Sequence, residues 1–372
     1  MKIGIPKEII PGEARVAAVP DTVKKFCDKG FTVCVEKSAG EGSYFTDDAY
    51  AQAGAQLTDA SEALGADLVL KVGISTPDEI DKMKQDALLC SLLDPCHNED
   101  VLAKLAAKGV TAFAMELIPR TTRAQSMDVL SSQAGIAGYR AVLEAASHYS
   151  RFFPMMMTAA GAARPAKLMV LGAGVAGLQA IATGRRLGCD VEAFDVRPAV
   201  REEIQSLGAK FIDLDVGENG AGEGGYAKEL SEEGKKKQQE ALTEYLKKAN
   251  IIISTALIPC RPAPVLITEE AVKGLAEGSV IVDLAAGSGG NCPLSEPDQV
   301  VVKEGVIIIG HTNYPSMVSS DASSFYARNL FNLVAILAEE KDGTFSWKDF
   351  AEDDITKAAM VTQGGQVVYQ KP

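Results

Sequence analysis

Residues 166–195 read AKLMVLGAGVAGLQAIATGRRLGCDVEAFD, the pattern of a strand, a glycine-rich turn, a helix and a second strand. The turn, Gly172-Ala173-Gly174-Val175-Ala176-Gly177, has the G-x-G-x-x-G spacing. In this motif the first glycine permits a tight turn and the second lets the backbone approach a pyrophosphate. The third lets the helix pack closely against the strand, with its free N–H groups facing the phosphates. The stretch therefore predicts a dinucleotide-binding unit.

The residues after the second strand bear on the choice of nucleotide. Asp195 follows the glycines by about 20 residues, where a carboxylate accepts a hydrogen bond from the adenosine ribose 2′-hydroxyl. A carboxylate there repels a 2′-phosphate, which favours NAD over NADP. Arg197 lies two residues further on and is able to hold a phosphate, so NADP stays open at this point.

Length and charge exclude some partners. A chain of 372 residues predicts about two domains. The net charge of −13 gives no electrostatic reason to expect nucleic acid or an anionic membrane surface. The N-terminus becomes polar too early for a signal peptide, and no stretch reaches the roughly 20 apolar residues of a membrane span. We expect a cytoplasmic chain without direct membrane insertion.

The cysteines and histidines predict no metal site. Seven cysteines are scattered without a C-x-x-C pair, which indicates reduced thiols rather than a disulfide framework or a zinc site. The three histidines are not spaced for metal binding; they are His97, His148 and His311.

The order of expected elements predicts the α/β class, with two Rossmann-like, doubly wound parallel-sheet domains. Short β-rich runs alternate with amphipathic helical patterns before residue 130, but no glycine-rich loop follows a strand there. Two long helical patterns, at 134–152 and 322–340, are expected to join the domains, with a cleft between them. The first domain would comprise 1–133 plus 320–372 and the nucleotide-binding domain 134–319.

Two segments fall outside this scheme. Residues 213–245 contain six glycines and a dense run of charges, which predicts a mobile surface loop including a helix. Tyr226 is able to close over a ligand, although an insertion without a role is the alternative. The tail, residues 341–372, contains Trp347 and is expected to be a short extra segment without chemistry.

A polar cluster, RTTRAQSMDVLSSQ, occupies residues 120–133. It follows an expected strand and leads into a long helix, so it should lie at the carboxyl edge of the first sheet, where ligands bind. Gln125 can donate and accept hydrogen bonds, Asp128 can accept them, and Arg120 supplies a forked cation. The same stretch also suits a helix start capped by Ser126 or Asp128. The two interpretations are compatible.

A general acid or base is hard to find. Oxidation of an alcohol, amine or hydroxy acid moves a proton as well as a hydride, and so needs a positioned acid or base. His97 lies in a polar turn, His148 falls inside a long helix, and nothing in the sequence pairs His311 with a carboxylate.

Several stretches together carry a resemblance to a known family; they include GEARVAAVP (12–20), RTTRAQSMD (120–128), FPMMMTAAG (153–161), TALIP (255–259), GGNCPLSEP (289–297) and HTNYPS (311–316). With them the chain resembles the NAD(H)-binding domain I, or alpha subunit, of proton-translocating NAD(P) transhydrogenase. The match covers nearly the whole chain. The wider superfamily also contains alanine dehydrogenase.

The resemblance implies direct hydride transfer between NADH on this chain and NADP⁺ on a partner domain, which requires no general acid. It implies that a polar loop orients the nicotinamide ring and its ribose, through Arg120, Gln125, Asp128 and Ser131. Val175, Asp195, Val196 and Arg197 would bracket the adenosine end. Gly225 and Tyr226 would belong to the closing loop, and Thr255, Ala256 and Leu257 would lie near the ribose.

The resemblance also implies partners. They are a transmembrane transhydrogenase domain that couples hydride transfer to proton translocation, an NADP(H)-binding domain, and a second copy of this chain in a homodimer. The chain would then be peripheral on the cytoplasmic face of the membrane, or on the matrix side.

Two other functions remain as alternatives. Alanine dehydrogenase binds pyruvate with an arginine and a lysine, and Arg15 and Lys71 stand at the similar positions. The histidine and aspartate of that family fall near Leu93-Asp94 and Ala286-Gly287 in this chain, which disfavours amino-acid oxidation, although Asp94 could be an unorthodox acid. A non-catalytic NAD-binding sensor is the other alternative, and the intact polar loop argues against it.

Overall fold

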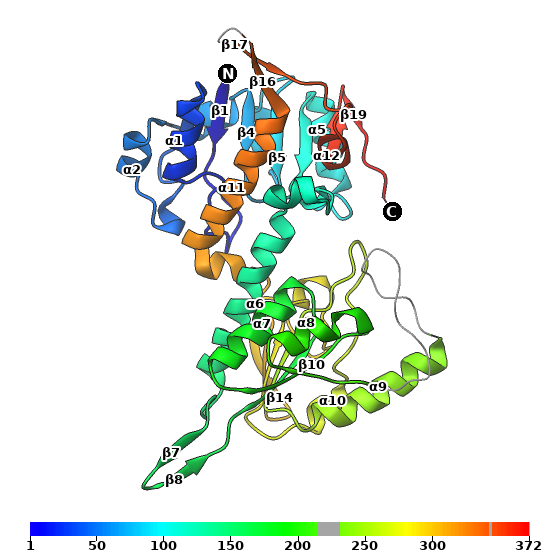
Figure 1. Ribbon diagram of the computed structural model, residues 1–372. Coiled ribbons are helices and arrows are strands. Elements are labelled where there is room, and N and C mark those ends of the chain that lie inside the picture. Colours follow the sequence, from blue (N-terminus) through cyan, green and yellow to red (C-terminus); the bar gives the residue numbers. More distant parts are fainter. Residues whose placement is uncertain (215–230, 342–343, 372) are drawn as a thin grey trace. The chain divides into compact units, whose positions relative to one another are not determined.

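The computed structural model describes residues 1–214, 231–341 and 344–371 (Figure 1). Contacts within the chain define two compact units, one of Met1–Gln133 with Pro315–Pro372 and one of Ala134–Tyr314. Helix α6 (Val129–His148) begins in the first unit and continues into the second. Helix α11 (Ser319–Leu337) lies within the first unit.

The first unit is built on a sheet with the strand order β19-β18-β6-β5-β4-β1-β2-β3. Strands β1 to β6 are parallel, and their order reverses between β1 and β4. This reversal is the switch point at which doubly wound sheets bind ligands. The strands are β1 (Lys2–Ile5), β2 (Thr32–Glu36), β3 (Gln56–Thr58), β4 (Leu68–Leu70), β5 (Leu88–Ser91) and β6 (Thr111–Ala114); the helices are α1 (Pro20–Asp28), α2 (Asp47–Gln52), α3 (Ala60–Leu64), α4 (Pro77–Lys82) and α5 (Glu99–Lys108).

Helices cover both faces of this sheet because successive strand residues point to opposite sides. Leu68 and Leu70 pack in the same core as Leu330 and Leu333 of α11, whereas Val69 packs with residues of α4 and α5 on the other face. The central strand β4 is therefore apolar and buried at every position, as expected where a sheet is covered on both sides.

The tail contributes more structure than its sequence indicates. Strand β18 (Met360–Gln363) pairs antiparallel with β6 and extends the first sheet, and β19 (Gln366–Val367) pairs with β18. Helix α12 (Asp354–Ala359) packs near β6, and β16 (Ala338–Lys341) pairs with β17 (Thr344–Trp347) in a separate hairpin. The sequence did not indicate these strands because short strands inside a tail carry little periodicity of their own.

The second unit has the strand order β11-β10-β9-β12-β13-β15-β14, parallel except for β14. Its order reverses between β9 and β12, which defines a second switch point. The strands are β9 (Lys167–Leu171), β10 (Asp190–Phe194), β11 (Lys210–Phe211), β12 (Ile251–Ser254), β13 (Val280–Asp283), β14 (Val300–Lys303) and β15 (Val306–Ile309); the helices are α7 (Val175–Arg186), α8 (Arg201–Ser206), α9 (Glu232–Leu246) and α10 (Glu269–Lys273). The α/β prediction with Rossmann-like parallel sheets is confirmed.

Helix α9 occupies the end of the predicted surface loop, and its Leu242 and Leu246 are buried in the core of the second unit. Residues 215–230, including Gly225 and Tyr226, lie outside the described part of the chain. A hairpin of β7 (Met156–Thr158) and β8 (Gly161–Ala163) extends from this unit (Figure 1). Among the described helices, none combines the length and apolar character needed to span a membrane.

Candidate functional site

The glycine-rich turn of the second unit follows β9 at the switch point. Gly172 has a φ of +91°, in the left-handed region that favours glycine, and its N–H donates to the Phe194 carbonyl at 2.9 Å. A Cβ at Gly177 would lie 1.9 Å from the Gly172 carbonyl oxygen. Helix α7 therefore starts in direct contact with the turn, which requires glycine at both positions.

The start of α7 is open toward solvent. Gly174 is the N-cap residue, and a Cβ there would meet no heavy atom of the described chain within 4 Å. The next residue, Val175, is 44% exposed. The first N–H groups of a helix have no partners within the helix, and they attract anions. The space beside Gly174 suits a pyrophosphate.

Helix α6 packs directly on this turn. A Cβ at Gly138 would lie 2.0 Å from the carbonyl oxygen of Ala176, so no larger residue is compatible with the observed backbone. The close approach of α6 holds the first turn of α7 in place.

Asp195 lies beside the turn, as its position in the sequence predicts. It is buried, and its Oδ2 accepts the N–H of Ala173 at 2.7 Å. Arg197 forms an ion pair with the same carboxylate, with its Nη2 at 2.9 Å from Oδ2. Burial raises the pKa of Asp195, but these donors outweigh burial and hold the pKa below its usual range. The carboxylate is therefore ionised and already engaged.

The segment after β12 forms the other side of the switch point. The N–H of Thr255 donates to the Leu171 carbonyl at 2.8 Å, and its Oγ1 donates to the carbonyls of Leu171 and Gly172 at 3.2 Å each. Leu257 is 55% exposed. Thr255 thus ties the segment to the glycine-rich turn and leaves Leu257 accessible.

A buried asparagine holds this segment, and the sequence alone indicated no role for it. Asn291 accepts hydrogen bonds from Ser254 Oγ at 2.6 Å and from the Ala256 N–H at 3.2 Å, and it donates to the carbonyls of Ala256 and Pro264. Nearby, Asp283 accepts bonds from the backbone of Ala285 and Cys292 and from Ser295. Asn291 belongs to the GGNCPLSEP stretch. The two glycines directly before it, which follow β13 in the chain, were the feature of the sequence that could have pointed to this residue.

In the first unit the polar cluster forms the 3₁₀ helix η3 (Thr122–Met127) and the start of α6. Asp128 accepts the N–H of Ser131 at 2.9 Å and its Oγ at 2.6 Å, so it caps α6 as one interpretation predicts. Asn329 and Asn332 of α11 both donate to the Ser126 carbonyl, at 2.8 and 3.0 Å. The cluster is therefore exposed but fixed by α11.

The basic and amide side chains of this cluster differ in their contacts. Arg123 forms ion pairs with Asp353 and Asp354 of the tail, so it stabilises the fold of this unit. Arg120 and Gln125 are exposed, and within the described chain their side chains make no hydrogen bond or ion pair. Both side chains are therefore available to a ligand.

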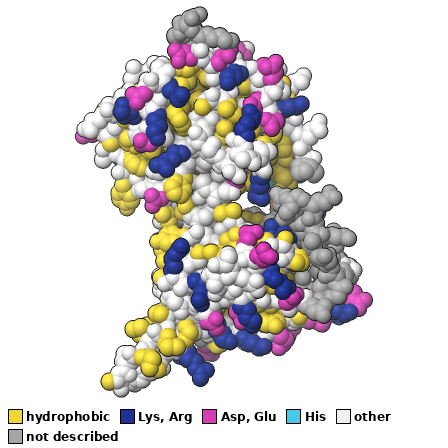
Figure 2. Space-filling model, in the orientation of Figure 1, with side chains coloured by type: hydrophobic (Ala, Val, Ile, Leu, Met, Phe, Trp, Pro, Cys, Tyr) yellow, Lys and Arg dark blue, Asp and Glu magenta, His cyan; other side chains and the backbone are white. Residues whose placement is uncertain are grey.

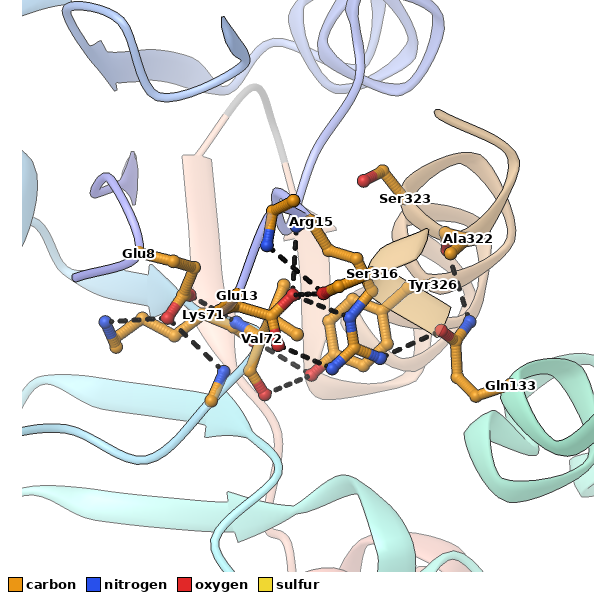
Figure 3. A network of polar contacts seen from close by, with 12 residues as sticks. Glu8, Glu13, Arg15, Lys71, Val72, Gln133, Ser316, Ala322, Ser323 and Tyr326 are labelled. Atoms are coloured by element: carbon orange, nitrogen blue, oxygen red, sulfur yellow. Dashed lines mark hydrogen bonds and ion pairs between the residues drawn. The ribbon is translucent and has the colours of Figure 1, made fainter. Parts of the chain in front are cut away.

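A network of buried charges lies at the switch point of the first sheet (Figure 3). Arg15 donates to Glu13 through Nε at 2.8 Å and Nη2 at 2.6 Å, and through Nη1 to Gln133 at 2.9 Å. Lys71 is fully buried between Glu79 at 2.7 Å and Glu8 at 3.2 Å. Burial lowers the pKa of Lys71, but Glu8 and Glu79 outweigh burial and raise the net pKa. Both cations are thus neutralised by carboxylates of their own unit.

Two of the three histidines, His97 and His311, lie near carboxylates. His311 Nε2 lies 3.7 Å from Glu144 Oε2, and Arg140 pairs with the same residue at 2.6 Å. His97 Nδ1 lies 2.9 Å from Asp94, with both side chains more than half exposed. The sequence did not reveal the carboxylate beside His311 because Glu144 lies on α6, far away in sequence. Among the described residues, no group of histidine, cysteine or acidic side chains is arranged to hold a metal.

Comparison with known proteins covers both units. Residues 4–137 match the alanine dehydrogenase/PNT N-terminal domain, and residues 141–370 match the C-terminal domain of that family. The chain is 51% identical to the first portion of the divided NAD(P) transhydrogenase subunit alpha of Rhodospirillum rubrum, over 99% of this chain and 98% of that protein. A transhydrogenase structure from Sinorhizobium meliloti superimposes with a TM-score of 0.87 at 43% identity, over 99% of both chains. An L-alanine dehydrogenase structure superimposes with a TM-score of 0.83 at 27% identity, over 99% of this chain and 97% of that one.

Proposed function

The chain belongs to the alanine dehydrogenase/PNT family and is a component of NAD(P) transhydrogenase, and we propose that it supplies the NAD(H)-binding half of the reaction site. The observation that carries this proposal is the open space at Gly174 beside a buried, ionised Asp195, both at the switch point of the second sheet. The helix start would bind the pyrophosphate, and Asp195 would meet the adenosine ribose. Val175 and Val196 would lie with Asp195 at the adenosine end, Ala176 would belong to the glycine-rich turn at the pyrophosphate, and Thr255 to Leu257 would lie near the ribose.

In this proposal NADP(H) is held by a partner domain, and hydride passes directly between the two nicotinamide rings. Such a transfer releases no proton at the reacting carbon, so the chain needs to orient its nicotinamide and has no need of a general acid. Arg120 and Gln125 would contact the nicotinamide end, while Asp128 and Ser131 fix the start of α6 behind them. Gly225 and Tyr226 are proposed to contact the nucleotide as well. Positioning of this kind lowers a barrier by several kcal/mol.

The proposed assembly includes a transmembrane partner that couples hydride transfer to proton translocation, with this chain on the cytoplasmic face of the membrane. The Rhodospirillum rubrum relative is named as one portion of a subunit alpha, which supports a divided enzyme with further subunits. We also propose a homodimer.

The second candidate function is an alanine dehydrogenase-like activity, which the 27% identical structure brings into consideration. Pyruvate would need a cation to meet its carboxylate. Glu13 already engages Arg15, and Glu8 and Glu79 already engage Lys71, so the charge of each cation is balanced within its own unit and attracts a substrate anion less strongly. These contacts favour the transhydrogenase function.

A redox assay with the purified chain and NADH distinguishes the two. One mixture contains pyruvate and ammonium, and the other contains NADP⁺ and an NADP(H)-binding transhydrogenase domain. We expect NADH oxidation only in the second mixture. Oxidation in the first would instead establish the dehydrogenase, and binding of NADH without turnover in either would indicate a sensor.

A further inference from the structure

The 3₁₀ helix η3 is longer than such helices usually are. It spans six residues, whereas 3₁₀ helices seldom run beyond about four because their hydrogen bonds are poorly aligned. Side chains three positions apart lie above one another on a 3₁₀ helix, so η3 presents three rows. Ala124 and Met127 form a row that is buried in the core of the first unit, whereas Thr122 and Gln125 form an exposed row. Contacts from outside the helix are needed to hold it in one orientation.

Arg123, in the third row, joins η3 to the tail of the chain. Its two terminal nitrogens donate to the two carboxylate oxygens of Asp353, with Nη1 at 2.9 Å from Oδ2, and Nη2 also pairs with Asp354. A guanidinium that binds one carboxylate through two parallel hydrogen bonds is fixed in direction as well as in position. The same guanidinium holds the pKa of Asp353 below its usual range, so this carboxylate is ionised.

The two aspartates belong to a part of the tail that is anchored in the fold. Asp353 is the N-cap residue of α12, and its Oδ1 accepts the N–H of Ile355 at 2.9 Å. Ile355 and Ala359 of this helix are buried in the core of the first unit. The strand that follows, β18, pairs with β6 in the first sheet. The carboxylates that meet Arg123 are therefore held by elements on both sides of them in the chain.

Helix α11 holds the other end of η3. Asn329 and Asn332 both donate to the carbonyl oxygen of Ser126, at 2.8 and 3.0 Å. Arg123 lies three positions before Ser126, near the start of η3. With one outside contact near each end, η3 is prevented from rotating about its own axis. The exposed row that includes Gln125 is thereby held in one direction.

We propose that Arg123 is a positioning residue for hydride transfer, with Asp353 and Asp354 as its fixed support. Arg123 does not touch the nucleotide in this proposal. Its ion pairs set the rotation of η3, and that rotation sets where the Gln125 amide lies. A displacement of about 1 Å in such a group slows a reaction by up to about 100-fold. This inference rests on the proposed function, because it requires Gln125 to contact the nicotinamide.

The test compares variants of the full chain. Arg123→Gln removes the cation. Asp353→Asn combined with Asp354→Asn removes both carboxylate charges, and asparagine is still able to cap α12. A triple variant carries all three substitutions. Stopped-flow transfer from NADH to NADP⁺ on a saturating NADP(H)-binding domain gives the rate, and the fluorescence of the reduced nicotinamide gives the NADH dissociation constant. Lys24→Gln, which removes an exposed ion pair with Asp28 in the same unit, is the matched control.

We expect Arg123→Gln and the aspartate double variant each to slow hydride transfer about tenfold, with an NADH dissociation constant within about threefold of the wild-type value. The triple variant should be no slower than either of these, because Arg123 and the two aspartates act as one unit. Arg123→Lys keeps the charge but loses the forked geometry, so its rate should be intermediate. Lys24→Gln should transfer hydride at the wild-type rate.

The outcomes separate the inference from the proposed function. A wild type that transfers no hydride to the partner domain contradicts the proposed function itself. A wild-type rate in Arg123→Gln overturns the inference alone, and so does a further loss in the triple variant, because the residues would then act separately. A slow rate with equally weakened NADH binding also overturns it, since Arg123 would then support binding. Circular dichroism checks the fold, and if Arg123→Gln does not fold, Arg123→Lys with the aspartate variants makes the same test.

Discussion

Arg15 and Lys71 lie buried at the switch point of the first sheet, and each meets carboxylates of its own unit. Glu13 is the partner most affected by its pairing. Burial raises its pKa, but the Arg15 guanidinium and the Ser316 hydroxyl outweigh burial and lower the pKa to about 2. The buried charges of Arg15, Lys71 and their carboxylate partners therefore stabilise the fold. The exposed side chains of Arg120 and Gln125 are instead accessible to a bound nucleotide.

The Glu13 pairing predicts a pH-dependent stability. A carboxylate with a lowered folded-state pKa stabilises the fold above its unfolded pKa, and this contribution is lost as pH falls from about 4.5 toward 2. The difference of some 2.5 pKa units corresponds to about 3 kcal/mol. Glu13→Gln should therefore lower the free energy of unfolding by about 3 kcal/mol at pH 7, and by much less near pH 3.

Urea unfolding followed by the fluorescence of Trp347, the only tryptophan, measures this in the first unit. The exposed Glu41 gives a matched control, and Glu41→Gln should change stability at pH 7 by less than about 0.5 kcal/mol. An equal loss for Glu13→Gln at pH 7 and pH 3 would contradict the prediction.

Gln125 makes no hydrogen bond through its side chain within the described chain, so its substitution should leave the fold unchanged. Gln125→Asn withdraws the amide by one methylene, which is enough to misplace a bound nicotinamide by about 1 Å and to slow hydride transfer by up to about 100-fold. We expect the NADH dissociation constant to stay within about threefold. Stopped-flow transfer to NADP⁺ on a saturating partner domain measures the rate. Gln52→Asn, at an exposed position on α2, is the control. An unchanged rate of hydride transfer in Gln125→Asn would contradict the proposal that Gln125 positions the nicotinamide.

At the scale of elements, glycines determine how closely helices and turns approach. Gly177 brings α7 against the turn after β9, and Gly138 brings α6 against the first turn of α7. The N–H groups proposed to bind pyrophosphate are thereby held from two sides. Geometry at the helix start therefore depends on α6, a helix that donates no ligand there itself.

Gly138→Ala tests this contact. Alanine favours a helix over glycine by about 1 kcal/mol, but its Cβ would lie 2.0 Å from the backbone oxygen of Ala176, so the helices must separate. The clash should outweigh the propensity and weaken NADH binding at least tenfold. Gly135→Ala is the matched control on the same helix, because its Cβ would lie 3.9 Å from Val175, an ordinary contact. Isothermal titration with NADH measures both, and equal affinities would show that the contact is unimportant.

At the scale of the whole molecule, the fold of a single chain does not explain why the β7–β8 hairpin exposes apolar side chains. Two-stranded hairpins are marginally stable on their own. Here Phe152, Met155 and Met157 are 56%, 61% and 76% exposed, and apolar side chains are visible along this hairpin in Figure 2. Exposed apolar groups of this kind favour contact with another chain.

We therefore expect the hairpin to form part of the proposed homodimer contact. Met157→Asp would place a charge in that contact and should shift the chain from dimer to monomer, with the fold of each chain retained. Sedimentation equilibrium measures the mass. Val302→Asp, at a residue 65% exposed on β14, controls for an added charge elsewhere and should stay dimeric. A monomeric wild type, or a dimeric Met157→Asp, would contradict the expectation.

The local sequence determined the α/β class and most of the elements. Strands such as Ile251–Ser254 and Val306–Ile309 can be recognised in the sequence because buried parallel strands are continuous apolar runs with clear ends. The glycine-rich turn and Asp195 were found for a similar reason: their spacing is set within one strand–helix–strand unit, so the signal is contained in 30 consecutive residues. Their roles, like those of Arg120 and Gln125, stay predictions.

Only the tertiary structure revealed which polar groups are already engaged. Arg123 pairs with Asp353 and Asp354, His311 meets Glu144, and Asn291 holds the backbone after β12. Strand β18 likewise joins β6 from the far end of the chain. These contacts join residues that are distant in sequence, and no local pattern encodes them. Periodicity reports which face of an element is buried, whereas the partner of a charge is decided by how the sheets bring separate segments together.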